Sequence, residues 1–298
     1  MNIPLYLKPK NKVAIVCTAR SADREELQPA IDVLEEWGLV PVLGKTIGLK
    51  HHQFGGTDPD RAEDLQQQLN DPEIKAIFIA KGGYGTARIL DQLDFMSFLN
   101  RPKWIVGYSD VTALHLKLQQ LGIASLHADM PVDFPKKSEK SLESIRRCLF
   151  GNSDGFKYQS TFTSVNGEAD GVLVGGNLSV LYSVLGTKDL PSFKNKILFL
   201  EDLDEYLYHI DRMLLNLKRN GILSQLSGLI VGGMTSMHDN TIPFGYSAHQ
   251  IILNHVAEYN YPVAFDCPAG HLDENLAMVL GAKIRLTVEN NSVEFTYI

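Results

Sequence analysis

The first half of the chain alternates short apolar runs with segments whose apolar residues recur at helical spacing. Residues 13–17 are a continuous apolar run, which is typical of a strand buried on both faces of a parallel sheet, and residues 74–80 are mainly apolar. Residues 23–38 carry an apolar stripe between a capping aspartate and a terminal glycine. We expect strands at 13–17, 40–43, 74–80 and 104–106, and helices at 23–38, 58–70, 86–93 and 110–122. Such alternation predicts an α/β fold with a doubly wound parallel sheet, which binds ligands beyond the carboxyl ends of its strands.

A change of composition divides the chain. Gly, Ser, Asn and Thr dominate between about Phe150 and Asp170, where apolar periodicity fades. We therefore expect an N-terminal domain over 1–150, a linker over 151–170 and a C-terminal α/β domain over 171–298. In this second domain we expect a short helix after Asn177, strands at 197–200, 228–233 and 263–266, helices at 207–217 and 247–258, and a final hairpin of 283–288 with 293–297.

Composition excludes some classes of partner. The chain has 298 residues, of which 44% are hydrophobic and 21% charged, as in ordinary globular enzymes. Its net charge of -7, without a basic patch, argues against nucleic acid or an anionic membrane as the main partner. Three scattered cysteines, Cys17, Cys148 and Cys267, fit a reducing compartment. Because no apolar run approaches the ~18 residues of a membrane span, we expect a cytoplasmic protein.

Ser109 stands where the predicted strand 104–106 turns into a helix. A serine hydroxyl is a poor nucleophile at neutral pH, so hydrolysis requires a base, a carboxylate that orients the base, and donors for the oxyanion. Gly107 gives room for a sharp turn before Ser109, but Val111 replaces the second glycine of the G-x-S-x-G pattern. A serine that only caps the following helix fits the same residues.

Two other side chains are candidates for the base and its carboxylate. Glu201 follows the apolar strand 197–200, which places a carboxylate at the carboxyl edge of a sheet. An acid at a helix N-terminus, or a partner for Arg212, is the alternative interpretation. His271 lies in a loop after a predicted strand, where functional residues are frequent. A histidine bonded only to backbone is the alternative there.

The run Gly82-Gly83-Tyr84-Gly85 follows a strand and leads into a helix. Two adjacent glycines let backbone N–H groups turn towards an anion, as in oxyanion holes. The spacing of a P-loop is absent, and so is a G-x-G-x-x-G fingerprint, so nucleotide binding has little support.

Metal binding and thiol chemistry are weaker candidates. The close groupings of metal-ligating residues, none in an H-E-x-x-H motif, are His51-His52, His127 with Asp129, and His238-Asp239, and we expect no metal. Cys17 ends the first strand, but its neighbours supply no glycine for an elbow. A buried thiol is the better interpretation of Cys17.

Five blocks together resemble one family. The stretch 106–115, V-G-Y-S-D-V-T-A-L-H, resembles the nucleophile motif of the LD-carboxypeptidase family. The segment 200–202, L-E-D, followed by H-I-D-R-M-L at 209–214, is similar to its glutamate segment, and P-A-G-H at 268–271 to its histidine segment. Gly82–Gly85 and Gly175–Leu178 match further blocks, so the resemblance spans nearly the whole chain in order.

The resemblance implies a Ser-His-Glu triad. It implies a flavodoxin-like or amidotransferase-like N-terminal domain that bears Ser109 and a C-terminal domain that bears Glu201 and His271. Ser109 would attack the carbonyl, His271 would take its proton and return it to the leaving amine, and Glu201 would orient the imidazole.

The resemblance also implies the surroundings and the substrate. The amide of Asp110, with Gly82 or Gly83, would stabilise the oxyanion, whereas Tyr84 and Asn177 would bind substrate. The family removes the terminal D-alanine from an L,D-peptide bond of murein tetrapeptides in cell-wall recycling. The implied partner is a small murein peptide, no cofactor is implied, and a homodimer is a family expectation.

Two departures and two rival functions remain. Lys81 stands where the family often has arginine, and residues 18–21, T-A-R-S, replace a serine-containing, proline-rich segment, so both departures concern substrate recognition. One rival is a microcin-immunity-like hydrolase of aspartyl-adenylate amides, which carries a basic residue where this chain has Glu205. The other is a non-catalytic two-domain ligand-binding protein in which Ser109 is only a helix cap.

Overall fold

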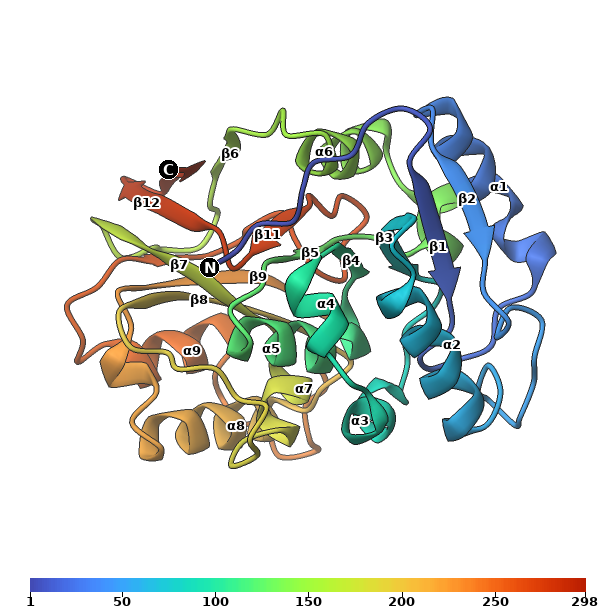
Figure 1. Ribbon diagram of the computed structural model, residues 1–298. Helices are drawn as coiled ribbons and strands as arrows, with labels where there is room; N and C mark the ends of the chain where they lie inside the picture. The colour runs from blue at the N-terminus through green and yellow to red at the C-terminus, as the bar shows by residue number, and fades with distance from the viewer. The chain divides into compact units, whose positions relative to one another are not determined.

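The computed structural model describes all 298 residues, which divide into two compact units (Figure 1). Unit 1 comprises Met1–Ser153 and Asp273–Gly281. Unit 2 comprises Asp154–Leu272 and Ala282–Ile298. The chain is an α/β protein with one mixed, mainly parallel sheet in each unit.

Unit 1 contains a six-stranded sheet in the order β11-β5-β4-β3-β1-β2. Its strands are β1 (Lys12–Val16), β2 (Val40–Leu43), β3 (Ile74–Ile79), β4 (Trp104–Gly107), β5 (Ser125–His127) and β11 (Met278–Leu280). All neighbours pair in parallel except β11, which runs antiparallel to β5. The order confirms the predicted doubly wound sheet, in which ligands bind beyond the carboxyl ends of the strands.

The helices of unit 1 cover both faces of that sheet. They are α1 (Arg24–Glu36), α2 (Asp58–Asn70), α3 (Thr86–Ile89), α4 (Met96–Asn100), α5 (Thr112–Gln120) and α6 (Glu139–Leu149). Figure 1 shows α1 and α2 on opposite sides of β1 and β2. This follows from topology, since the connections to β2 and to β3 run in opposite directions across the sheet and both are right-handed. The helix expected at 86–93 is shorter, because a 3₁₀ turn, Leu90–Gln92, follows α3.

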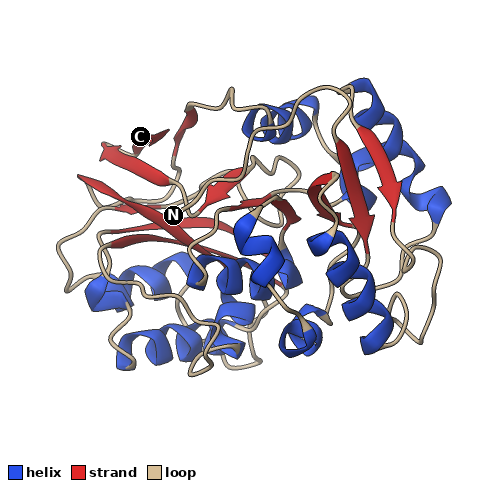
Figure 2. Cartoon of the chain, viewed as in Figure 1, coloured by secondary structure: helices blue, strands red, loops and turns tan.

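Unit 2 contains a seven-stranded sheet in the order β10-β9-β8-β7-β12-β13-β6. The strands are β6 (Gly155–Gln159), β7 (Gly167–Asn177), β8 (Lys196–Leu203), β9 (Gly228–Thr235), β10 (Val263–Ala264), β12 (Lys283–Glu289) and β13 (Ser292–Tyr297). Strands β7 to β10 pair in parallel, whereas β12 and β13 form the predicted antiparallel hairpin. The helices α7 (Leu178–Ser183), α8 (Leu207–Arg219) and α9 (Ala248–Val256) lie on one face of β7, β8 and β9 (Figures 1 and 2).

The segment expected to be a linker, 151–170, contains β6 and the first residues of β7. Strand β6 is a half-exposed edge strand paired with β13, so its sequence lacks the apolar alternation that predicts a strand. Strand β7 continues to Asn177, past the two glycines that suggested a helix start. Gly175 fits there because a Cβ at this position would lie 2.1 Å from the carbonyl oxygen of Phe199.

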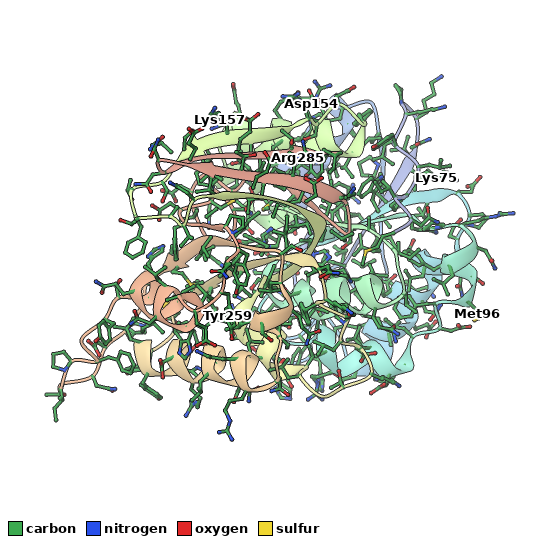
Figure 3. All side chains as sticks on the ribbon, turned by 90° about the vertical axis from the view of Figure 1, so that its left-hand side faces the viewer. Lys75, Met96, Asp154, Lys157, Tyr259 and Arg285 are labelled. Carbon is green, nitrogen blue, oxygen red and sulfur yellow. The ribbon has the colours of Figure 1, made fainter.

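Exposed charges mark the register of the unit 2 sheet. Arg285 on β12, labelled with Lys157 of β6 in Figure 3, lies opposite Asp170 of β7 and pairs with its carboxylate at 2.7 Å. Both side chains are partly exposed, so this ion pair contributes little to stability. The two residues are direct cross-strand neighbours in the pairing of β7 with β12.

None of the helices has both the length and the apolar composition that a bilayer crossing requires.

Candidate active site

Ser109 occupies a strained elbow between β4 and α5. Its backbone φ is 61°, in the left-handed region that residues other than glycine rarely adopt. A strand, a sharp turn and a helix arranged in this way expose a serine hydroxyl at the carboxyl edge of a parallel sheet. Backbone strain of this kind, about 1–3 kcal/mol, persists only where the surroundings hold the residue in place.

Buried groups fix the conformation of the turn that precedes Ser109. A Cβ on Gly107 would lie 2.8 Å from Cγ2 of Val111, so the turn closes against the helix start. The fully buried His115 donates from Nε2 to the carbonyl of Gly107 at 2.8 Å, and its Nδ1 accepts from the hydroxyl of Ser125 at 2.8 Å. Burial lowers the pKa of His115 to about 3, so the ring stays neutral and keeps both bonds.

The helix-cap interpretation of Ser109 does not fit this geometry. The capping position of α5 is Val111, and no side chain caps that helix. The preceding 3₁₀ turn, Ser109–Val111, also lacks a side-chain cap. The hydroxyl of Ser109 makes no hydrogen bond within the protein, which leaves it available to a base or a substrate.

The Gly82–Gly85 loop lies against the elbow in unit 1. A Cβ on Gly82 would be 3.5 Å from Cβ of Ser109. The buried carboxylate of Asp110 accepts from the amide of Gly85 at 3.3 Å and from that of Thr86 at 2.9 Å. Burial raises the pKa of Asp110, while these N–H donors favour its charged form. The elbow and the glycine loop are thus tied together by one carboxylate.

The amides in this loop are suited to an oxyanion. The N–H groups of Gly82 and Gly83 donate to no acceptor within the protein. Gly83 has a φ of 113°, which turns its peptide out of the strand direction. Unpaired amides beside a serine hydroxyl are the arrangement that stabilises negative charge in acyl transfer.

Arg61, which the sequence analysis did not identify, stabilises the Gly82–Gly85 loop. Its guanidinium is fully buried and donates to the carbonyl of Gly85 at 3.1 Å and to that of Thr18. It also pairs with Asp58 and lies 4.7 Å from the centroid of the Phe54 ring. The available signal was a cluster of polar residues on the buried face of α2, where Arg61 is joined by Asp64 and Gln68.

Glu201 and His271 form a close pair within unit 2. Glu201 lies near the end of β8 and has no exposed area. Nδ1 of His271 and Oε2 of Glu201 are 2.6 Å apart, and the backbone N–H of His271 donates to the same oxygen at 3.2 Å. Two donors on one oxygen match the requirement that a buried carboxylate be hydrogen bonded. The bond fixes the proton on Nδ1, so Nε2 carries the lone pair that a base requires.

The alternative interpretations of this pair do not match the contacts. Arg212 lies over the Tyr208 ring, 5.4 Å from its centroid, rather than beside Glu201. The ring of His271 is bonded to a carboxylate, whereas its own carbonyl accepts from the Thr235 hydroxyl at 3.1 Å.

Gly270 is required by the close approach of Glu201. Its φ is 106°, and a Cβ there would lie 2.7 Å from both Cβ and Oε2 of Glu201. The glycine that precedes the histidine therefore has a steric reason as well as a conformational one.

Asn177, expected to bind substrate, is buried and bonded within unit 2. Its Oδ1 caps α7 by accepting from the amide of Val180 at 3.1 Å, and its Nδ2 donates to Asp202 at 2.9 Å. Burial, followed by the charge of Glu201, raises the pKa of Asp202 to about 7. Asn177 therefore caps α7 and bonds Asp202, the residue that follows Glu201 in β8.

Tyr84, expected to bind substrate, is 54% exposed, so its ring is accessible to a ligand.

Burial raises the pKa of the Cys17 thiol to about 12, as expected for a buried core thiol. No cluster of three or more metal-ligating side chains is present, and His238 bonds Asp204 at 2.5 Å.

A serine on a strained elbow and a buried carboxylate–histidine pair on an α/β framework define the class of serine hydrolases. A family model described as the LD-carboxypeptidase N-terminal domain matches residues 13–128, and one described as the LD-carboxypeptidase C-terminal domain matches residues 170–286. The chain belongs to the LD-carboxypeptidase family and is a serine-type carboxypeptidase.

Individual relatives agree with this assignment. A probable murein peptide carboxypeptidase of Bacillus subtilis is 34% identical, over 97% of this chain and 93% of its own. The microcin C7 self-immunity protein of Escherichia coli is 25% identical, over 89% of this chain and 86% of its own. The crystal structure of a muramoyltetrapeptide carboxypeptidase from Oxalobacter formigenes has a TM-score of 0.86 at 25% identity, covering 96% of this chain and 98% of its own.

Replacing Gly270 tests the packing of the histidine loop. We expect Gly270→Ala to displace the Glu201 carboxylate from His271 and to lower peptidase kcat/KM by about 100-fold, since a shift of ~1 Å at a catalytic group has that effect. Gly245→Ala is the matched control, because Gly245 also has a positive φ, of 92°, but nothing within 4 Å of its Cβ position. Equal activity of the two variants would show that the close approach has no functional role.

The raised pKa of Asp202 predicts a pH-dependent stability. Because the folded pKa, about 7, exceeds the ordinary value of 3.8, the contribution of the protonated group is fully present below pH 3.8 and is lost as the pH rises through about 7. Asp202→Asn should therefore gain about 2 kcal/mol relative to the unmodified protein between pH 5 and pH 8.

Urea unfolding followed by circular dichroism at the two pH values measures this difference. Asp204→Asn serves as the control, since the Asp204 side chain is 70% exposed. A stability difference between Asp202→Asn and the unmodified protein that is the same at both pH values would contradict the raised pKa.

Proposed function

We propose that this chain removes the terminal D-alanine from an L,D-peptide bond of murein tetrapeptides, with Ser109, His271 and Glu201 as a catalytic triad. The observation that carries the proposal is the bond of 2.6 Å between the buried Glu201 carboxylate and Nδ1 of His271. Because this bond fixes the proton on Nδ1, Nε2 of His271 carries the lone pair of a base, and Ser109 has the elbow geometry of a nucleophile. The relatives named for murein peptides support the substrate class.

The first half of the reaction forms an acyl-enzyme. Nε2 of His271 takes the proton of Ser109 as Oγ attacks the carbonyl carbon of the L-centred residue. The negative charge that develops on the carbonyl oxygen is stabilised by the amide of Asp110 together with that of Gly82 or Gly83, each donor being worth about 3 kcal/mol. Glu201 stabilises the imidazolium that forms. The tetrahedral species collapses when His271 protonates the nitrogen of D-alanine, which leaves.

The second half regenerates the enzyme. A water molecule gives a proton to Nε2 of His271 and attacks the ester carbon, and the same amides stabilise the second oxyanion. Oγ of Ser109 then recovers its proton and the shortened peptide departs. This sequence uses only side chains and backbone amides of the chain, and no step calls for a cofactor.

We place this activity in the cytoplasm and in the recycling of cell-wall peptides. The three cysteines are free and buried, which fits a reducing compartment.

A homodimer is part of the same proposal, on the basis of the family resemblance. Gel filtration with light scattering tests the dimer independently of activity.

The immunity-type reaction on an aspartyl-adenylate amide is the second candidate, because the microcin C7 self-immunity protein is a relative. A basic side chain near the triad glutamate would hold the aspartyl carboxylate in that reaction. Here the position is Glu205, whose carboxylate lies 2.6 Å from Nδ1 of His209. A carboxylate at this position disfavours an anionic aspartyl group, and so the murein peptide is the better substrate.

Substrate identity is tested by incubating the protein with a murein tetrapeptide. We expect free D-alanine to appear in amounts equal to the tripeptide product, as measured by a D-amino-acid oxidase assay and mass spectrometry. Ser109→Ala should release none and should not react with a fluorophosphonate probe that labels the unmodified protein. Hydrolysis of an aspartyl-adenylate amide without release of D-alanine would replace the murein proposal by the immunity-type reaction. Absence of labelling at Ser109 would remove the nucleophile.

The carboxylate of the triad is tested by Glu201→Gln. A carboxamide has nearly the same shape but donates as well as accepts, so it permits the wrong tautomer of His271, and we expect kcat to fall about 10⁴-fold. Glu294→Gln, at an exposed position of β13, is the control that should keep full activity. Circular dichroism should show both variants folded. Activity of Glu201→Gln within tenfold of the unmodified enzyme would exclude Glu201 from the triad.

A further inference from the structure

Arg20 is an exposed cation fixed beside the glycine loop of unit 1. The segment that follows β1 is held on two sides: Arg20 pairs with Phe54 in an isolated bridge, and its backbone N–H donates to the carbonyl of Gly82 at 3.4 Å. The amide of Gly55 donates to the carbonyl of Ala19 at 3.0 Å. The backbone of Arg20 therefore has a defined position relative to the loop after β3.

The side chain of Arg20 lies directly over Gly83. A Cβ on Gly83 would be 2.5 Å from Nε, 2.7 Å from Cδ and 2.8 Å from Cγ of Arg20. Only a glycine leaves room for the arginine stem at this distance. On the other side, a Cβ on Gly82 would be 3.5 Å from Cβ of Ser109. Arg20, the two glycines and Ser109 are thus successive neighbours along one edge of unit 1.

The guanidinium of Arg20 differs from the other cations of this region because it has no partner within the protein. Lys81 pairs with Glu26 at 3.0 Å, and Arg88 pairs with Asp58 at 2.6 Å. Arg61 is buried and also pairs with Asp58. Arg20 makes no ion pair and no side-chain hydrogen bond, although the chain has a net charge of -7 and many carboxylates. Its charge is available to an anionic ligand.

A carboxypeptidase requires such a group. Its substrate ends in a free carboxylate, which lies only three covalent bonds from the carbonyl carbon that the nucleophile attacks. An arginine fork binds a carboxylate through two parallel N–H···O bonds and discriminates against a neutral terminus. We propose that Arg20 binds the terminal carboxylate of the leaving D-residue and thereby restricts cleavage to the last peptide bond. This inference rests on the proposed function and adds to it the residue that selects a free C-terminus.

The experiment compares two substrates that differ only at the terminus, the murein tetrapeptide acid and its C-terminal amide. The unmodified enzyme should prefer the acid by about 100-fold in kcat/KM. Arg20→Ala should lower kcat/KM for the acid by about 100-fold, chiefly through KM, and leave the amide within about threefold, so that the preference disappears. Arg20→Lys should keep part of the preference, since it retains the charge without the fork.

Two controls separate binding from folding. Arg101→Ala removes another exposed arginine without an ion pair, located before β4 and therefore at the opposite edge of the sheet from Ser109, and should keep the full preference. The rate of fluorophosphonate labelling at Ser109 should be unchanged in Arg20→Ala, which shows an intact elbow.

The outcomes are distinct. If the unmodified enzyme releases D-alanine but Arg20→Ala retains the preference for the acid, or loses both substrates equally, Arg20 does not bind the terminal carboxylate and the inference is overturned. If the unmodified enzyme releases no D-alanine from the acid, the proposed function fails, and the inference fails with it.

Discussion

The burial of the Glu201 carboxylate is the constraint on which unit 2 depends most. An ionised carboxylate without exposed area is tolerated only when hydrogen bonds replace its hydration. Here the bonds come from the ring and the backbone N–H of His271, so the loop that carries the histidine must pass close to β8. That approach leaves no room for a side chain at Gly270. Burial, and after it the neighbouring charge of Glu201, raises the pKa of Asp202. The Glu201 side chain thereby requires a glycine at position 270 and contributes to the raised pKa of Asp202.

In unit 1, buried polar groups that are hydrogen bonded likewise fix the position of a candidate catalytic residue. Ser109 is held at a strained φ by partners that are themselves buried and bonded, namely the His115 ring behind the turn and the Asp110 carboxylate beneath the glycine loop. Arg61 donates to the carbonyl of Gly85 in that loop and to the carbonyl of Thr18. The groups without a partner within the protein include the Ser109 hydroxyl and the amides of Gly82 and Gly83, which have a use in the proposed mechanism, and also the buried Nε of Arg61 and the guanidinium of Arg20.

The alternating pattern was sufficient to predict the doubly wound sheet and the final hairpin, because strands such as β1 are buried on both faces and read as continuous apolar runs. It did not predict β6, whose polar edge position removes the apolar signal, or the continuation of β7 through Gly175, which reflects a close backbone contact. Glu201 and His271 are far apart in sequence, and only the fold shows that their side chains bond. The buried supports, His115 and Arg61, escaped notice because burial of a polar residue depends on tertiary packing.

The residues proposed for bond cleavage and those proposed for substrate recognition lie in different environments. The groups assigned to bond cleavage are fixed by buried hydrogen bonds, so a substitution there disturbs several partners at once. Arg20 and Tyr84 are exposed, and the side chain of Arg20 occupies space that a side chain at Gly83 would need. Such positions can change without rearranging the interior. Within residues 18–21, which depart from the family pattern, Arg20 is exposed, whereas Thr18 and Ala19 are fully buried. A substitution of Arg20 therefore disturbs fewer buried partners than a substitution of Glu201.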